Sequence, residues 1–199
     1  MIEFDDIDVV QDNSFRNWHA PGLNYLCLSR TVARTHKVYF VPPSEDKPIV
    51  APHNHRFNFE IMVLEGALVH YTYHVVEHDD DGEVYQHLQY KSPNVGGDGF
   101  VWVGQKFLRR STQVLYPGER IFLWADQVHT LRADTEQGVI LEQIQREDIV
   151  PPEATTDTYM KGVNKTPPSL AGLYVKPTLA EISRWFHRYR ELRGVVTST

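Results

Sequence analysis

Two histidines and a glutamate lie close together near the middle of the chain, in an order that suits metal coordination. His53 and His55 are separated by one residue, and Glu60 follows after four more. On a strand, residues two apart project to the same face, so both imidazoles can point into one space. The four intervening residues leave room for a turn or bulge, after which Glu60 can open the next strand and face that space. Such a group suits iron(II), manganese, nickel or zinc.

A second segment adds one histidine. Pro117-Gly118 leads into an apolar stretch, a short turn and then His129. Together the two segments resemble the cupin superfamily, whose signatures are G-x5-H-x-H-x3/4-E-x6-G and G-x5-P-x-G-x2-H-x3-N. Gly118 and His129 are eleven residues apart, as the second signature requires. The resemblance implies a divalent metal ion inside a jelly-roll barrel, with four ligands that would also carry catalysis: His53, His55, Glu60 and His129.

The chain departs from both signatures outside the ligand positions. Gly66 closes the first signature one residue early, and Lys47 stands where its first glycine is expected. In the second signature, Trp124 and Asp126 replace proline and glycine, and Ala133 replaces asparagine. Aspartate tolerates left-handed backbone better than most residues, so the turn before His129 can still form. The resemblance covers roughly residues 50–145.

Short β-prone runs separated by turn residues must position these ligands. Strands are expected at residues 24–30, 33–41, 60–64, 67–76, 84–90, 100–103, 113–115, 120–123, 129–132 and 138–145. Many short strands at this spacing are typical of an antiparallel sandwich or barrel. We therefore predict a mainly β fold, a cupin-type jelly-roll β-barrel at residues 23–150, preceded by an N-terminal arm at residues 1–22. A proline-rich wrapping segment and a helix follow at residues 151–199, and the part at residues 151–168 is expected to be a loop.

The C-terminal helix is predicted from its cap and its apolar stripe. Thr178 and Glu181 form a capping box, and Gly194 is expected to end the helix. Apolar side chains recur at helical spacing in between, at Leu179, Ile182, Trp185, Phe186, Tyr189 and Leu192. This amphipathic helix must cover either the outside of the barrel or a second subunit.

Composition narrows the classes of partner. The formal net charge is −6 over 199 residues, which favours neither a nucleic acid nor an anionic membrane surface. The longest apolar runs have the length of a strand, short of the roughly 20 residues that span a bilayer. Cys27 is the one cysteine, so no intramolecular disulfide can form, and we expect it in the core. These features favour the cytoplasm.

Four further residues are candidates for substrate binding. Arg56 follows the histidine pair and could reach an anionic or polar substrate. On the expected strand at residues 67–76, His70 shares one face with His74, and Tyr71 shares the other with Tyr73. One of these faces is expected to line the barrel beside the metal, and the sequence does not decide which.

The resemblance implies a metal-dependent enzyme that acts on a small molecule. With iron(II), three histidines and a carboxylate would support a dioxygenase, which is an oxidoreductase. Manganese or zinc would instead serve as a Lewis acid. Two alternatives stay open: a non-catalytic cupin that binds a small ligand or is structural, and a metal-free sugar epimerase or isomerase. A homodimer is expected on family grounds.

Overall fold

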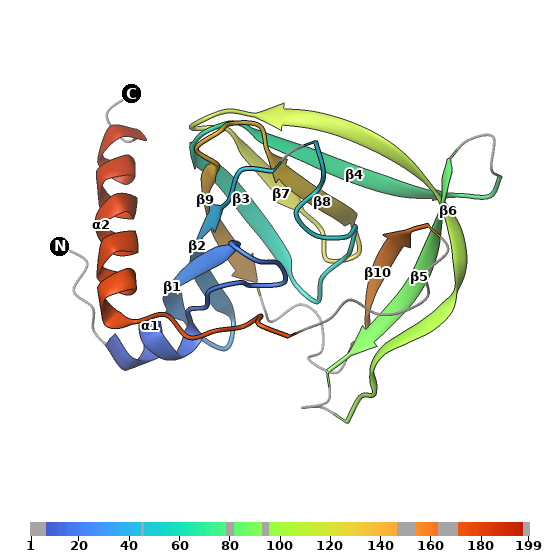
Figure 1. Ribbon diagram of the computed structural model, residues 1–199, viewed down its shortest axis with the longest axis horizontal. Helices are drawn as coiled ribbons and strands as arrows, with labels where there is room; N and C mark the ends of the chain where they lie inside the picture. Colours follow the sequence, from blue (N-terminus) through green and yellow to red (C-terminus); the bar gives the residue numbers. More distant parts are fainter. Residues whose placement is uncertain are drawn as a thin grey trace.

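The computed structural model describes residues 7–44, 46–78, 82–92, 96–146, 154–162 and 171–196. Two five-stranded antiparallel sheets form the body of the molecule (Figure 1). The first sheet has the order β1 (Asn24–Arg30), β2 (Arg34–Val41), β9 (Val139–Arg146), β3 (Asn58–Glu65), β7 (Arg120–Leu123). The second has the order β10 (Thr156–Lys161), β5 (Glu83–Lys91), β6 (Gly99–Leu115), β4 (Leu68–Val76), β8 (Val128–Ala133).

A short extended segment at residues 49–54 completes the jelly roll. It pairs with β8, because the Ile49 amide donates to the Leu131 carbonyl at 3.0 Å and His53 forms an antiparallel bridge with His129. The group β2-β9-β3-β7 then faces the group formed by residues 49–54, β8, β4 and β6. Two facing sheets in this order are the double-sheet jelly roll. The predicted fold class, a mainly β jelly roll with a C-terminal helix, is confirmed.

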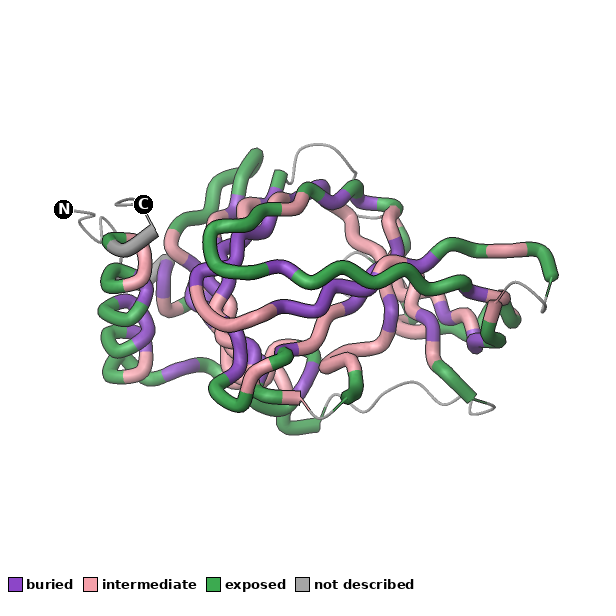
Figure 2. Tube along the Cα trace, turned by 90° about the horizontal axis from the view of Figure 1, so that it is seen from above, coloured by how far each residue is buried: buried purple, intermediate pink, exposed green. Residues whose placement is uncertain are grey.

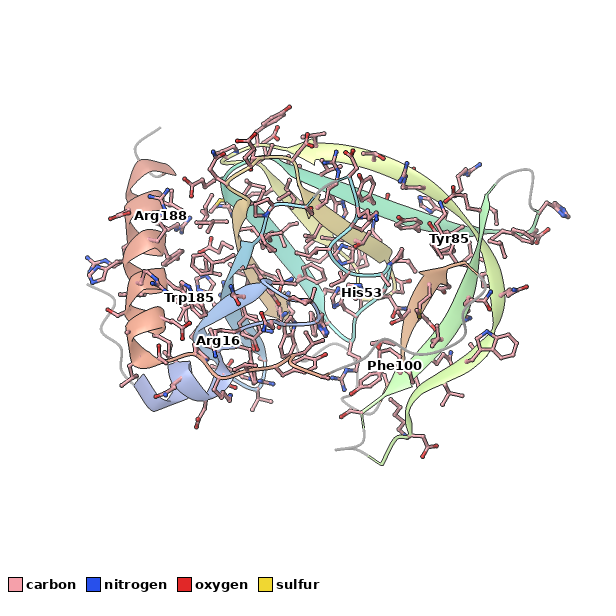
Figure 3. All side chains as sticks on the ribbon, in the orientation of Figure 1. Arg16, His53, Tyr85, Phe100, Trp185 and Arg188 are labelled. Atoms are coloured by element: carbon pink, nitrogen blue, oxygen red, sulfur yellow. The ribbon has the colours of Figure 1, made fainter. Side chains whose placement is uncertain are left out.

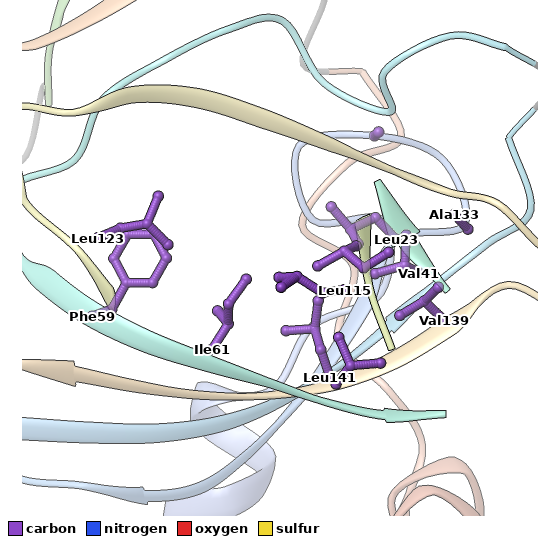
Figure 4. Close-up of a cluster of buried hydrophobic side chains, with 12 residues drawn as sticks. Leu23, Val41, Phe59, Ile61, Leu115, Leu123, Ala133, Val139 and Leu141 are labelled. Carbon is purple, nitrogen blue, oxygen red and sulfur yellow. The ribbon is translucent and has the colours of Figure 1, made fainter. Parts of the chain in front are cut away.

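The core of the jelly roll lies between the two facing groups. Phe59 and Ile61 on β3 are 1% and 2% exposed, and they pack with Leu115 of β6 and Leu68 of β4 (Figure 4). Residues two apart on a strand share a face, so odd-numbered positions of β3 point into this core. The even-numbered Met62 instead packs outside the barrel, against the helices.

The second sheet closes on itself through the same segment that carries His53. The backbone of residues 52–54 bonds to β8 on one side and to β10 on the other, since His53 forms bridges with both His129 and Thr158. β10, β5, β6, β4 and β8 thereby form a ring that encloses a second core, contributed by Val69, Tyr71, Tyr73, Tyr85, Leu108, Val128 and Tyr159. We call this group the ring core.

The ring corrects one expectation and extends another. A loop was expected across residues 151–168, of which 151–153 and 163–168 lie outside the described residues, but Thr156–Lys161 form β10. Its β-branched and aromatic residues suit a strand that pairs along β5. β6 is one continuous strand where two short strands were expected. Apart from Leu108 its middle is largely exposed, so no apolar alternation marks it, and it bulges beside Gly104, whose φ is 148°.

Two helices cover the outer face of the first sheet. α1 (Ile7–Asn13) contacts β1, and α2 (Leu179–Val196) packs Ile182, Trp185 and Phe186 against that sheet. Figure 2 shows α2 buried on the side that faces the strands and exposed on the other. Gly194 does not end α2, which continues to Val196, because Gly194 lacks the left-handed backbone of a C-cap. No helix in the described ranges is long and apolar enough to cross a membrane.

Candidate metal centre

Three histidines from two distant parts of the chain converge inside the jelly roll. His53 lies in the extended segment at residues 52–54, His55 follows it, and His129 lies on β8. Because His53 and His129 exchange backbone hydrogen bonds of 3.0 and 2.9 Å, they are direct cross-strand neighbours. One ring nitrogen of each histidine lies within 4.8 Å of the others. Figure 3 shows His53 between the first sheet and the ring.

The hydrogen bonds around two of these imidazoles favour free Nε2 atoms. His53 Nδ1 lies 2.8 Å from the Ala51 carbonyl oxygen, which can only accept, so Nδ1 carries the proton and Nε2 carries the lone pair. His129 Nδ1 lies 3.0 Å from Nε2 of His70 on β4. If His129 donates this hydrogen bond, its Nε2 is also unprotonated. A partner on the second ring nitrogen is the arrangement that orients a metal-binding histidine.

The separation of the nitrogens suits a single ion. His55 Nε2 and His129 Nε2 are 2.9 Å apart. Two nitrogen ligands at right angles around a metal, each about 2.1 Å from it, lie about 3 Å apart. A set of three imidazoles suits zinc, iron, nickel or copper and leaves further coordination positions for water or substrate. The described residues therefore fit a divalent transition-metal ion.

The surroundings keep the three imidazoles neutral, which is the form that binds metal. Burial lowers the pKa of His53 despite its hydrogen bond to Ala51. Burial holds the pKa of His55 and of His129 well below the usual range, and neighbouring histidines lower both further. His70, 1% exposed, has its pKa lowered to about 4 by burial.

The structure does not bring Glu60 to this group, which corrects the expected placement of the fourth ligand. Glu60 was expected to open a strand and face the histidines, but in β3 the odd-numbered Phe59, Ile61 and Val63 point into the core. The even-numbered Glu60 therefore falls on the outer face, where its carboxylate accepts a hydrogen bond of 2.8 Å from Arg120. A shift of one residue along a strand moves a side chain to the opposite face of the sheet.

Phe59 occupies the inward position that the carboxylate was expected to fill. Its ring centroid lies 4.8 Å from that of His55 and 5.5 Å from that of His129. Phe57 also contacts His55, with ring centroids 5.1 Å apart. The three histidines are thus flanked by apolar rings on the side of β3 and have no carboxylate from this strand.

The other predicted substrate residues fall in different places. His70 lies against His129, on the face of β4 that lines the jelly roll. Tyr71 and Tyr73 lie on the opposite face, in the ring core, where Arg132 donates a hydrogen bond of 3.0 Å to the Tyr71 hydroxyl. Arg56 is half-buried in the stretch that leads from His55 into β3.

Sequence reasoning missed several polar residues near the histidines. The His19 ring lies 6.2 Å from that of His53, and no motif marks it. Lys37, Gln143 and Gln145 lie on the inner face of β2 and β9, and all are at most 7% exposed. The alternation of side chains along a strand could have placed these residues on the inner face. Lys37 lies four residues before the core residue Val41, and Gln143 lies two residues after the core residue Leu141, so each shares a face with a core residue.

The order of the paired strands and the convergence of histidines from residues 53–55 and β8 agree with the architecture that the two signatures imply. The chain has the cupin fold. No protein-family model matches the sequence of this cupin-fold chain, and no curated protein matches it either.

Similar solved structures have low sequence identity. The hydroxypropylphosphonic acid epoxidase from S. wedmorenis is 17% identical, with a TM-score of 0.41 over 68% of this chain and 56% of that one. The DMSP lyase DddQ from Ruegeria pomeroyi is 14% identical, with a TM-score of 0.39 over 67% and 50%. The Schizosaccharomyces pombe Cnp3 cupin domain is 9% identical, with a TM-score of 0.38 over 63% and 61%. The matched part thus spans between half and two thirds of each of these chains.

Proposed function

We propose that this chain binds one divalent metal ion through His53, His55 and His129 and is a metal-dependent enzyme acting on a small molecule. The observation that carries the proposal is the convergence of three neutral imidazoles at the distances of a single coordination sphere. Among reactions, oxygenation by an iron(II) dioxygenase remains our leading proposal, because imidazole ligands suit iron(II) and leave positions open. Glu60 has no part in it.

Each residue of the group has a separate task in this proposal. His53, His55 and His129 bind the ion. The Ala51 carbonyl fixes the ring of His53, and His70 fixes the ring of His129. Phe57 and Phe59 exclude water from the side of β3. The bound ion would supply Lewis acidity or, with iron, electron transfer between substrate and oxygen.

The proposal is tested by measuring bound metal after loading with iron(II) without oxygen or with zinc. Wild type is expected to hold about one ion per chain, His129→Ala about none, and Glu60→Gln as much as wild type. Glu60→Gln is the decisive control, because a conventional four-ligand site would be weakened by it. Equal metal content in wild type and His129→Ala would overturn the proposal. Oxygen consumption by the iron-loaded protein then separates a dioxygenase from a binding protein.

A further inference from the structure

Polar side chains are grouped on one part of an otherwise apolar interior. Lys37 and Thr35 on β2 lie opposite Gln143 and Gln145 on β9, in register. Lys37 and Gln143 are each 7% exposed, Gln145 is 1% exposed and Thr35 is fully buried. Gln145 is in turn opposite Phe59 on β3, the residue that contacts His55 and His129. This polar face therefore continues directly to the proposed metal centre.

Lys37 brings a positive charge to this face. Its Nζ lies 4.6 Å from the centroid of the Tyr25 ring and 5.5 Å from that of Trp18. Trp18 contacts His19, which contacts His53, with ring centroids 4.7 and 6.2 Å apart. An ammonium group at this position can form a charge-assisted hydrogen bond with the carboxylate of a ligand.

Gln145 has a buried polar atom without a partner. Its Nε2 donates to Gln143 Oε1 at 2.5 Å, and its Oε1 is buried without a hydrogen bond. If both amides were turned over, Gln145 Nε2 would be the atom left over instead. Buried polar atoms in proteins nearly always have a partner. A hydroxyl or carbonyl group of a ligand can satisfy Gln145, since a hydroxyl both donates and accepts.

The charges and the spacing define the class of ligand. The outward position of Glu60 leaves the three histidines without its negative charge, so a bound ion would keep both of its positive charges. β2 and β3 are separated only by β9, and Lys37 is level with Ile61, two residues along β3 from Phe59. With neighbouring strands about 4.8 Å apart and a rise of about 3.4 Å per residue, Lys37 is roughly 12 Å from Phe59 across the sheet. A molecule that reaches from Lys37 toward the histidines is therefore small.

We propose that Lys37, Gln143 and Gln145 form a subsite for a small hydroxy- or oxo-carboxylic acid. Lys37 binds its carboxylate, and Gln145 binds a hydroxyl or carbonyl group on the same molecule. The other end of the acid lies at the three histidines. Only this last contact rests on the proposed function, because the subsite itself belongs to the sheet and needs no metal.

The test is calorimetric titration with L-malate and with its neutral diamide, L-malamide. Both are titrated into chelator-treated protein and into zinc-loaded protein. Wild type is compared with Lys37→Met, Gln145→Leu and the control Lys106→Met, which removes an exposed lysine of β6. Wild type is expected to bind L-malate about tenfold or more tightly than L-malamide, because one charge-assisted hydrogen bond is lost in the diamide.

Lys37→Met is expected to lose the preference for L-malate over L-malamide, whereas Lys106→Met is expected to keep it. Lys37→Met should still bind zinc as wild type does. Gln145→Leu is expected to weaken both compounds. The proposal is overturned if wild type binds no L-malate, or if Lys37→Met and Lys106→Met bind it equally. Should Lys37→Met not fold, the preference of wild type for L-malate over L-malamide decides. If the subsite is real but the metal centre is not, L-malate still binds to chelator-treated protein in a way that depends on Lys37, while zinc does not bind. The two proposals can therefore fail separately.

Discussion

The jelly-roll interior and the ring core lie on the two sides of residues 52–54 and share β4, β6 and β8, yet they differ in chemistry. Beside the ring core, polar side chains of the described residues pair with one another: His87 and Asn54 contact the Asp157 carboxylate at 2.7 and 2.8 Å. In the jelly roll, His70 Nδ1 and Gln145 Oε1 are buried without a hydrogen bond. Each unsatisfied buried group costs stability, and the presence of both groups on this side supports the ligand site proposed there.

The two interiors also differ in the kind of titratable group whose pKa burial shifts. Burial raises the pKa of Tyr159 in the ring core to about 12, with a further contribution from Asp157. Burial lowers the pKa of the jelly-roll histidines. Both effects favour neutral groups, but a neutral phenol is a poor metal ligand and a neutral imidazole is a good one. The same physical cause thus makes one interior inert and the other able to coordinate metal.

The largest expected effect separates packing from metal binding. Tyr159→Ala removes a ring that is 4% exposed and stacks on His87 with centroids 4.8 Å apart. We expect it to lower the free energy of unfolding by about 3 to 5 kcal/mol, measured by urea denaturation. The folded fraction should still bind zinc with the stoichiometry of wild type. Loss of zinc from folded Tyr159→Ala would show that the ring core belongs to the metal centre.

A second substitution tests the opposite interior without removing a ligand. His70→Leu deletes the partner of His129 Nδ1, so His129 loses its fixed orientation. We expect zinc affinity to fall about 10- to 100-fold, measured by competition with a chromophoric chelator. Tyr71→Phe is the matched control, because the next residue of β4 faces the ring core. Equal losses in both variants would contradict the assignment of faces.

Sequence reasoning identified the three histidines that the structure brings together, because a strand pattern and two signatures define their positions. Two histidines that are two residues apart point to the same face of any extended backbone. His129 follows Gly118 by the eleven residues that the second signature requires. Glu60 was misplaced because the face that each residue of β3 takes is set by the pairing of β3 with β7 and β9, not by its distance from the histidine pair. Asn58 begins the strand, and its Oδ1 accepts a hydrogen bond of 2.7 Å from the Ala125 amide, a long-range contact that no local pattern contains. The closure of the ring by β10 depends on pairing of equally long range.

Burial of polar residues was equally hard to predict. Glu142 resembles surface charge in the sequence, but it is 4% exposed beneath α2, where Tyr189 donates to its carboxylate at 2.8 Å. Lys37 and Gln145 lie on β-strands whose alternation is visible, but a polar residue at an inward position is normally read as evidence against burial. Such residues become interpretable only when the neighbouring strands are known.

A third substitution acts on the segment that the two interiors share. Asp157→Asn replaces a carboxylate oxygen with a donor that cannot accept from both Asn54 and His87. We expect the free energy of unfolding to fall by about 1 to 2 kcal/mol, because hydrogen bonds to a charged group are lost. Zinc affinity should also fall, by less than in His70→Leu, since Asn54 lies between His53 and His55. An unchanged zinc affinity would show that the two interiors are mechanically independent.

The smallest expected effect is a pH dependence that belongs to the jelly-roll side. The folded-state pKa of His70 is about 4, below the value near 6.5 of an unfolded histidine. Between these values the unfolded chain binds more protons, so stability is constant above about pH 6.5 and falls as the pH drops toward 4. One such histidine changes the free energy of unfolding by at most about 1.4 kcal/mol per pH unit.

Urea denaturation of chelator-treated protein at several pH values between about 7 and 5 measures this slope. His70→Leu is expected to have a shallower slope than wild type, by up to one proton, because the group that must charge on unfolding is gone. Tyr71→Phe should keep the slope of wild type, since it changes only the ring core. If His70→Leu and Tyr71→Phe showed the same slope of unfolding free energy against pH, burial of His70 would not be the source of the acid sensitivity. The proposed difference between the jelly-roll interior and the ring core would then be contradicted.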